Sequence, residues 1–174
     1  MNVVIANRQR VKKINARLLK QIIGELFSEL KIADAELGIH LVGAKEMALV
    51  NETFLQHAGS TDVITFDHAA LVTQASSLCV PSRKTHRLEA CATTLHGELF
   101  ICIDDAIAQA KEFKTSWQSE LVRYIVHGVL HLLGYDDLKP HLRRVMKREE
   151  NRLVRLLAKR FSFAQLARPA KLQP

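Results

Sequence analysis

The sequence predicts an α+β fold in which a small mixed β-sheet of about four strands is packed by about five helices. Segments with strand patterns lie before residue 104, whereas helical spacing dominates after it, and this order differs from the regular strand-helix alternation of an α/β fold. The chain has 174 residues, 48% of them hydrophobic, which is enough for one core. We therefore expect a single domain over residues 1–160 and a basic C-terminal tail over 161–174.

The N-terminal part contains all of the predicted strands. Short apolar or alternating runs indicate strands at residues 3–6, 37–42, 62–66 and 98–103. Two segments between them have apolar residues at steps of three and four, which predicts helices over 16–32 and 44–54. Residues 67–95 are rich in Ser, Thr and Ala and show little periodicity, so we expect a long loop there.

Helical spacing continues from residue 104 to residue 160. It predicts three helices, over 104–114, 118–133 and 140–160. Asp104 or Asp105 can cap the first of them, and Ser116 can cap the second. Gly134 can end the second helix, and Pro140 suits the first position of the third. The metal site proposed below would then lie at the end of a central helix.

Composition excludes some functional classes. No window is apolar enough to span a membrane and the N-terminus has no signal-peptide pattern, so we expect a cytoplasmic protein with no membrane partner. The irregular spacing of Cys79, Cys91 and Cys102 does not suggest a disulfide framework. Cys79, His86 and Cys91 could form a second metal site, although their spacing matches no common ligand pattern.

The formal charge of +7 is concentrated near the C-terminus. Residues 138–174 contain eleven Lys or Arg against two Glu, a net +9, which leaves −2 for residues 1–137. Such a field attracts phosphate backbones without selecting a sequence, although a solvated helix face gives the same pattern. The candidate RNA-binding residues are Arg143, Arg144, Lys147 and Arg148.

The segment from His127 to Asp137 carries the strongest chemical signal. His127 and His131 are four residues apart on a predicted helix, so both imidazoles can reach one ion. Gly134 would let the chain turn back and bring Asp137 toward them. Two His and one carboxylate leave a fourth position open, as in catalytic zinc sites, and the set also suits iron(II). His141 and Asp136 are alternative third ligands.

A metallopeptidase reading of this segment is weak. The spacing of the two histidines matches the zinc-peptidase signature H-E-x-x-H, in which the Glu beside the first ligand is the general base. Gly128 occupies that position here. Peptide hydrolysis by that mechanism is therefore not expected.

The segment His127-Gly128-Val129-Leu130-His131-Leu132-Leu133-Gly134-Tyr135-Asp136-Asp137 resembles the H-G-x-L-H-L-x-G-Y-D-H signature of the YbeY family of endoribonucleases and rRNA maturation factors. Three further pieces agree in order: Asn51 with Phe54, the segment Thr61 to Phe66, and the segment Gly97 to Ile101. The resemblance spans residues 1 to 155 approximately. It implies an α+β fold, a zinc ion and cleavage of single-stranded RNA during ribosome maturation, with precursor rRNA and the small ribosomal subunit as partners.

Two positions depart from the family pattern. Asp137 stands where the family has its third histidine ligand, which would lower the charge of the site and favour harder metals. Leu55 stands where the family usually has an arginine, which could bind phosphate and stabilise a transition state. Another cation could replace it, such as Arg83, Lys84 or Arg87.

The sequence favours a metal-dependent endoribonuclease acting on rRNA precursors. The general base is not identified by sequence, and Asp136 and Glu98 are the candidates. Thr61 and Asp62 are expected to cap a turn rather than to contact substrate. The alternative function is a ribosome-assembly factor that binds RNA or a ribosomal protein and uses the metal for its fold, and Leu55 favours this alternative.

Overall fold

A four-stranded mixed sheet forms the centre of the computed structural model, which describes residues 1–68 and 93–167. The strands are β1 (Asn2–Asn7), β2 (Ile32–Val42), β3 (Val63–Asp67) and β4 (Thr93–Cys102), in the order β1-β2-β4-β3. The first two and β4 are parallel, and β3 pairs antiparallel with β4. Within the described residues the α-helices are α1 (Ala16–Glu29), α2 (Ala44–Leu55), α4 (Ile103–Glu112), α5 (Trp117–Leu132) and α6 (Pro140–Arg160). The predicted fold class is confirmed.

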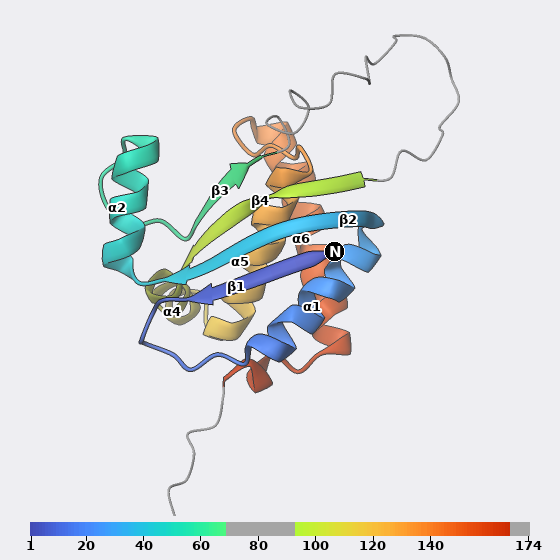
Figure 1. Cartoon of the computed structure of the whole chain (residues 1–174), viewed down its shortest axis with the longest axis horizontal. Coiled ribbons are helices and arrows are strands. Elements are labelled where there is room, and N and C mark those ends of the chain that lie inside the picture. The colour runs from blue at the N-terminus through green and yellow to red at the C-terminus, as the bar shows by residue number, and fades with distance from the viewer. Residues whose placement is uncertain (69–92, 168–174) are drawn as a thin grey trace, which may run out of the picture.

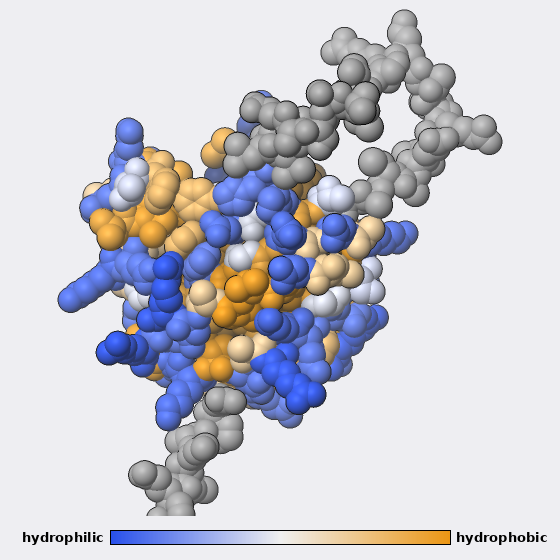
Figure 2. All heavy atoms as spheres, viewed as in Figure 1, coloured by the Kyte–Doolittle hydropathy of each residue, from blue (hydrophilic) through white to orange (hydrophobic). Residues whose placement is uncertain are grey.

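The helices cover mainly one face of this sheet. In Figure 1, α1, α5 and α6 lie behind the strands, whereas α2 stands apart beside β3. The buried residues Leu37 and Ile39 of β2 and Leu99 of β4 belong to the core beneath these helices. Figure 2 shows the opposite side, where apolar atoms at the centre are framed by hydrophilic ones. The sheet is therefore covered on one face and open on the other.

Strands β2 and β4 are longer than their apolar patterns indicated. The first helix ends at Glu29 rather than near residue 32, because Lys31 adopts a left-handed φ of 56° and Ile32 already starts β2. Exposed polar residues in the first half of β2 concealed it from a hydrophobicity pattern. Strand β4 likewise includes residues 93–95, which were expected in the loop. The long parallel pairing between β2 and β4 stabilises the additional residues at the start of both strands.

The predicted helix caps are partly confirmed. Ser116 accepts a hydrogen bond from the backbone amide of Ser119, 3.2 Å away, at the start of α5. The prediction that Asp104 or Asp105 caps α4 is wrong, because the N-cap is Cys102 without a side-chain cap. Asp104 instead accepts from the backbone amide of Ala44 at 2.7 Å and so caps α2. Tertiary proximity, which local sequence does not encode, decides that partner.

Ordered packing continues past residue 160. A short 3₁₀ helix, η1 (Phe163–Leu166), places Phe163 and Leu166 in the core, and Ala167 bridges to Ile14. The proposed second metal site at Cys79, His86 and Cys91 lies outside the described residues, as do residues 168–174 and the cations at 83, 84 and 87. Among the helices of the described ranges, none has the length and apolar character to cross a bilayer.

Candidate metal centre

Helix α5 presents His127 and His131 on one face while its other face packs on the sheet. Its buried residues include Val126, Val129 and Leu130. Gly128 allows the helix to lie close to β4, because a Cβ there would be 2.6 Å from Cδ2 of Leu99. This close packing explains why the position of a peptidase glutamate is occupied by glycine. Both histidines are half-buried and remain on the accessible side.

The structure brings together the three predicted metal ligands. The Nε2 atoms of His127 and His131 are 3.0 Å apart, and Asp137 Oδ1 is 4.0 Å from His131 Nε2. One ligand atom from each of the three residues lies within 4.8 Å of the other two. Gly134, with φ of 85°, ends the helix and turns the chain back, as the sequence predicted. Two nitrogens of one tetrahedral zinc lie about 3.3 Å apart at ordinary bond lengths, close to the spacing here.

Hydrogen bonds at Nδ1 fix both imidazoles in the form that a metal needs. His131 Nδ1 lies 3.0 Å from the backbone carbonyl of Tyr135, and His127 Nδ1 lies 3.2 Å from Glu150 Oε2. A carbonyl and an ionised carboxylate only accept, so Nδ1 of each imidazole donates, and its Nε2, which faces the Nε2 of the other ring, is the atom left to bind a metal. The residues therefore fit a divalent metal.

Glu150 of α6 is the centre of the charge network behind His127. Burial alone would raise the pKa of Glu150, but hydrogen bonds from His127, Lys147 and Arg123 outweigh it and lower that pKa to about 2. Arg123 Nη1 and Lys147 Nζ lie 2.5 and 2.8 Å from Glu150 Oε1. The carboxylate therefore stays ionised at neutral pH and holds two cations as well as the imidazole. Such second contacts orient metal ligands and raise their basicity.

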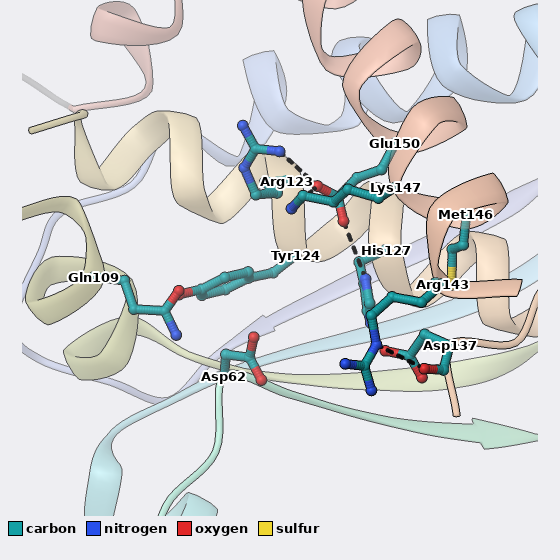
Figure 3. A pocket seen from close by; sticks show the side chains of 10 residues that line it. All are labelled: Asp62, Gln109, Arg123, Tyr124, His127, Asp137, Arg143, Met146, Lys147 and Glu150. Atoms are coloured by element: carbon teal, nitrogen blue, oxygen red, sulfur yellow. Dashed lines mark hydrogen bonds and ion pairs between the residues drawn. The ribbon is translucent and has the colours of Figure 1, made fainter. Parts of the chain in front are cut away.

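A pocket of about 380 Å³ opens beside His127 and Asp137. Figure 3 shows its lining side chains, which come from α4, α5, α6 and the segments that carry Asp62 and Asp137. The lining residues that the sequence analysis missed are Gln109, Arg123, Tyr124, Met146 and Glu150. The sequence did contain a signal for Glu150, because this residue falls at helical spacing among Met146, Leu153 and Leu157, which are buried on α6. A charged residue on an apolar helix stripe needs a partner.

The predicted cations of α6 divide into two groups. Arg143 and Lys147 line the pocket, whereas Arg144 and Arg148 are exposed outside it. Lys147 is paired with Glu150, whereas the one side-chain hydrogen bond of Arg143 to the described residues runs from Nε to the backbone carbonyl of Asp137, 2.9 Å away. Among the described residues that line the pocket, Arg143 is the cation without a carboxylate partner. Its terminal nitrogens bond to none of the described residues and can therefore receive an anion.

Neither sequence candidate for the general base lies in this pocket. Glu98 is on the open face of the sheet, where its carboxylate oxygens lie 3.3 Å from His40 Nε2 and 3.5 Å from His68 Nε2. Asp136 accepts from the backbone amide of Leu138 at 2.9 Å and lines a separate hollow. Asp62 caps its own turn through Val63, as expected, yet it also lines the pocket. Position therefore favours Asp62 over both predicted candidates.

The remaining site predictions fall elsewhere. His141 is exposed in the first turn of α6 and is not part of the three-residue metal group, so it does not replace Asp137 there. Leu55 ends α2, is 47% exposed and does not line the pocket. The position that carries arginine in the family pattern therefore offers no charge here.

Comparison with known proteins identifies the family. The model of the endoribonuclease YbeY family matches residues 4–158. An endoribonuclease YbeY of Chlorobium phaeovibrioides is 31% identical over 115 residues, 66% of this chain and 64% of its own length. One from Frankia alni is 30% identical over 155 residues, 88% of this chain and 81% of its own length. The match to the first relative, like that to one from Parabacteroides distasonis at 61%, covers less than two thirds of the relative's length.

A solved structure supports the same fold. The solution structure of TM1509 from Thermotoga maritima has a TM-score of 0.59 and 20% identity, and the match covers 98% of this chain and 99% of that one. At this identity the likeness concerns the fold alone. Since the family model covers most of the chain and includes the whole segment from His127 to Asp137, this protein is a member of the endoribonuclease YbeY family.

Proposed function

We propose that this protein is a metal-dependent endoribonuclease that cleaves single-stranded RNA during rRNA maturation and ribosome quality control in the cytoplasm. The observation that carries the proposal is the His127, His131 and Asp137 group, which borders an open pocket next to the unpaired guanidinium of Arg143. Family membership supports RNA as the substrate, and precursor rRNA and the small ribosomal subunit are the proposed partners.

The ligand set would hold one divalent metal, zinc in the first place and iron(II) as the alternative. Such an ion, when bound, supplies Lewis-acid polarisation of a water molecule and of a phosphate oxygen. Because Asp137 is a carboxylate, the site carries one positive charge fewer than a three-histidine site, which lowers the acidity of a bound water. We therefore expect the protein's own side chains to contribute more to activating the water and to stabilising the transition state.

Two side chains of the pocket can make these contributions to catalysis. Arg143 can donate its two terminal nitrogens to a phosphodiester and stabilise the charge that develops on it. Asp62 has its Oδ1 bonded to Val63 and Thr61, and its carboxylate can accept the proton of the attacking water. Glu150 is unsuited to this role, because hydrogen bonds from three donors lower its pKa to about 2 and make its carboxylate a weak proton acceptor. We therefore assign phosphate binding to Arg143 and proton transfer to Asp62.

Cleavage of a fluorescent single-stranded RNA should stop when a chelator removes the metal and return when zinc is added. Asp62→Asn should lower the cleavage rate by about 100-fold or more without changing metal content, because it removes a proton acceptor and leaves the metal ligands intact. Asp67→Asn, a matched change at the end of β3 outside the pocket lining, serves as the control. Cleavage that persists in the metal-free protein would contradict the proposal.

Binding of the same RNA by metal-loaded protein should weaken steeply with salt, as measured by fluorescence anisotropy. Each lost phosphate contact should reduce the slope of log K against log salt by about 0.7 for a single strand. We expect Arg144→Ala combined with Arg148→Ala to reduce the slope by about 1.4 and to leave metal content unchanged. A slope near zero in the wild type would exclude phosphate contacts by α6.

The exposed Leu55 is consistent with an alternative function, that of a non-catalytic binding factor. A factor that binds RNA or a ribosomal protein and holds its metal for stability would need no phosphate-stabilising arginine. Such a protein would show the salt-dependent binding but no metal-dependent cleavage. The cleavage experiment therefore separates the two functions.

A further inference from the structure

The hydroxyl of Tyr124 is a polar group that the metal chemistry does not use. Tyr124 is only 2% exposed, and its hydroxyl has no hydrogen-bond partner among the described residues, yet its side chain lines the pocket. Figure 3 shows the ring extending from α5 toward Gln109 of α4, on the side away from Arg143. Buried hydroxyls almost always have a partner, so this one needs a ligand or an ordered water.

The surroundings of this hydroxyl suit a planar, uncharged group. The half-buried Gln109 has a side-chain amide that offers one acceptor and two donors and bonds to none of the described residues. The ring of Tyr124 and the side chain of Met146 add apolar surface to the pocket lining. The nearby cations Arg123 and Lys147 are already paired with the two carboxylates of Glu120 and Glu150, so this end does not attract a second phosphate.

The position fits one nucleotide of RNA. Tyr124 precedes His127 by three residues on α5, a rise of about 4.5 Å along the helix. A nucleotide with its phosphate between the metal ligands and Arg143 could therefore place its base near Tyr124. Burial first, and then the charges of Asp62 and Glu120, raise the pKa of Tyr124 above its usual value. The hydroxyl thus stays protonated at neutral pH and can donate a hydrogen bond.

We propose that Tyr124 and Gln109 form a subsite that binds the edge of a nucleobase next to the scissile phosphate. The inference rests on the proposed function, because it takes an RNA nucleotide as the ligand. Proteins that read single-stranded RNA commonly bind splayed bases by hydrogen bonds to their edges and by contact with aromatic rings. The subsite would make this part of the pocket a determinant of base preference.

The test compares ligands that do and do not carry a base. Calorimetry on the zinc-loaded full chain would measure binding of AMP, GMP, CMP, UMP and ribose 5-phosphate. We expect at least one nucleotide to bind about tenfold more tightly than ribose 5-phosphate, the scale of one or two neutral hydrogen bonds. Tyr124→Phe and Gln109→Ala should each reduce that preference by about three- to tenfold. Zinc content and affinity for ribose 5-phosphate should stay unchanged, and Gln165→Ala on η1 serves as the control.

A structural water shared with Asp105, whose Oδ2 is also buried and unpartnered, is the competing explanation for the hydroxyl. In that case Tyr124→Phe would lower Tm and leave the nucleotide preference unchanged, which would overturn the proposal. Equal binding of all five ligands to the wild type would overturn it as well. Base preference without RNA cleavage would contradict the nuclease function and leave the subsite standing. Cleavage without base preference would contradict only the subsite.

Discussion

His131→Ala is expected to abolish metal binding while the protein stays folded. The substitution removes one of two imidazoles whose Nε2 atoms face each other at 3.0 Å, leaving a pair of ligands that cannot hold a catalytic ion firmly. Elemental mass spectrometry on untagged, dialysed protein should find about one zinc or iron per wild-type chain and none in the variant. Asp137→Ala should lose the metal too, because the third ligand disappears.

Three further variants make this experiment specific. Asp137→His should retain the metal, because an imidazole at that position completes a three-histidine set. His141→Ala and Asp136→Ala should also retain it, since neither residue belongs to the group of converging ligand atoms. Circular dichroism would show whether each variant keeps the native helix content. A folded His131→Ala protein with full metal content would refute the site, and a metal-free wild type would favour the non-catalytic assembly factor.

Glu150→Gln is expected to weaken both zinc binding and the fold. The charged carboxylate orients His127 at 3.2 Å and pairs with Arg123 and Lys147, so its loss leaves Lys147 without this counter-charge and Arg123 with Glu120 alone. Losing an outer contact of this kind typically lowers metal affinity about 10- to 100-fold. Because Arg123 and Lys147 are partly exposed, the loss in stability should be about 2 kcal/mol, less than for a fully buried pair.

The two effects can be measured separately. Competition with a zinc chelator would give the metal affinity, and urea unfolding of metal-free protein would give stability without the contribution of bound metal. Glu149→Gln is the matched control, because that carboxylate sits one residue away on α6 and pairs with Arg152 outside the pocket. Unchanged zinc affinity in Glu150→Gln would show that the carboxylate does not orient His127.

Local sequence was sufficient to predict the elements that depend on local energetics. The helical spacing after residue 104, the cap at Ser116, the stop at Gly134 and the start at Pro140 each involve interactions within a few residues. The ligand positions were predicted for the same reason. His127 and His131 share a helix face, and Asp137 follows the turn that Gly134 makes. Resemblance to the family added the implied reaction.

Other features depended on residues that are distant along the chain. Asp104 caps α2 rather than its own helix, and Glu98 points to the open face of the sheet instead of the metal group. Strand pairing decides that a residue at position 98 shares a face with His40, and no local pattern contains that information.

The sequence by itself determined the fold class and the family of this protein and located its three candidate metal ligands. Only the tertiary structure decided which side chains surround those ligands. Arg123, Arg143 and Glu150 converge because α5 and α6 pack side by side, and Gln109 reaches Tyr124 because α4 packs on α5. The physical reason is that a pocket is formed by faces of different helices. Its composition depends on their packing angles and registers, which arise from the whole core rather than from any one segment.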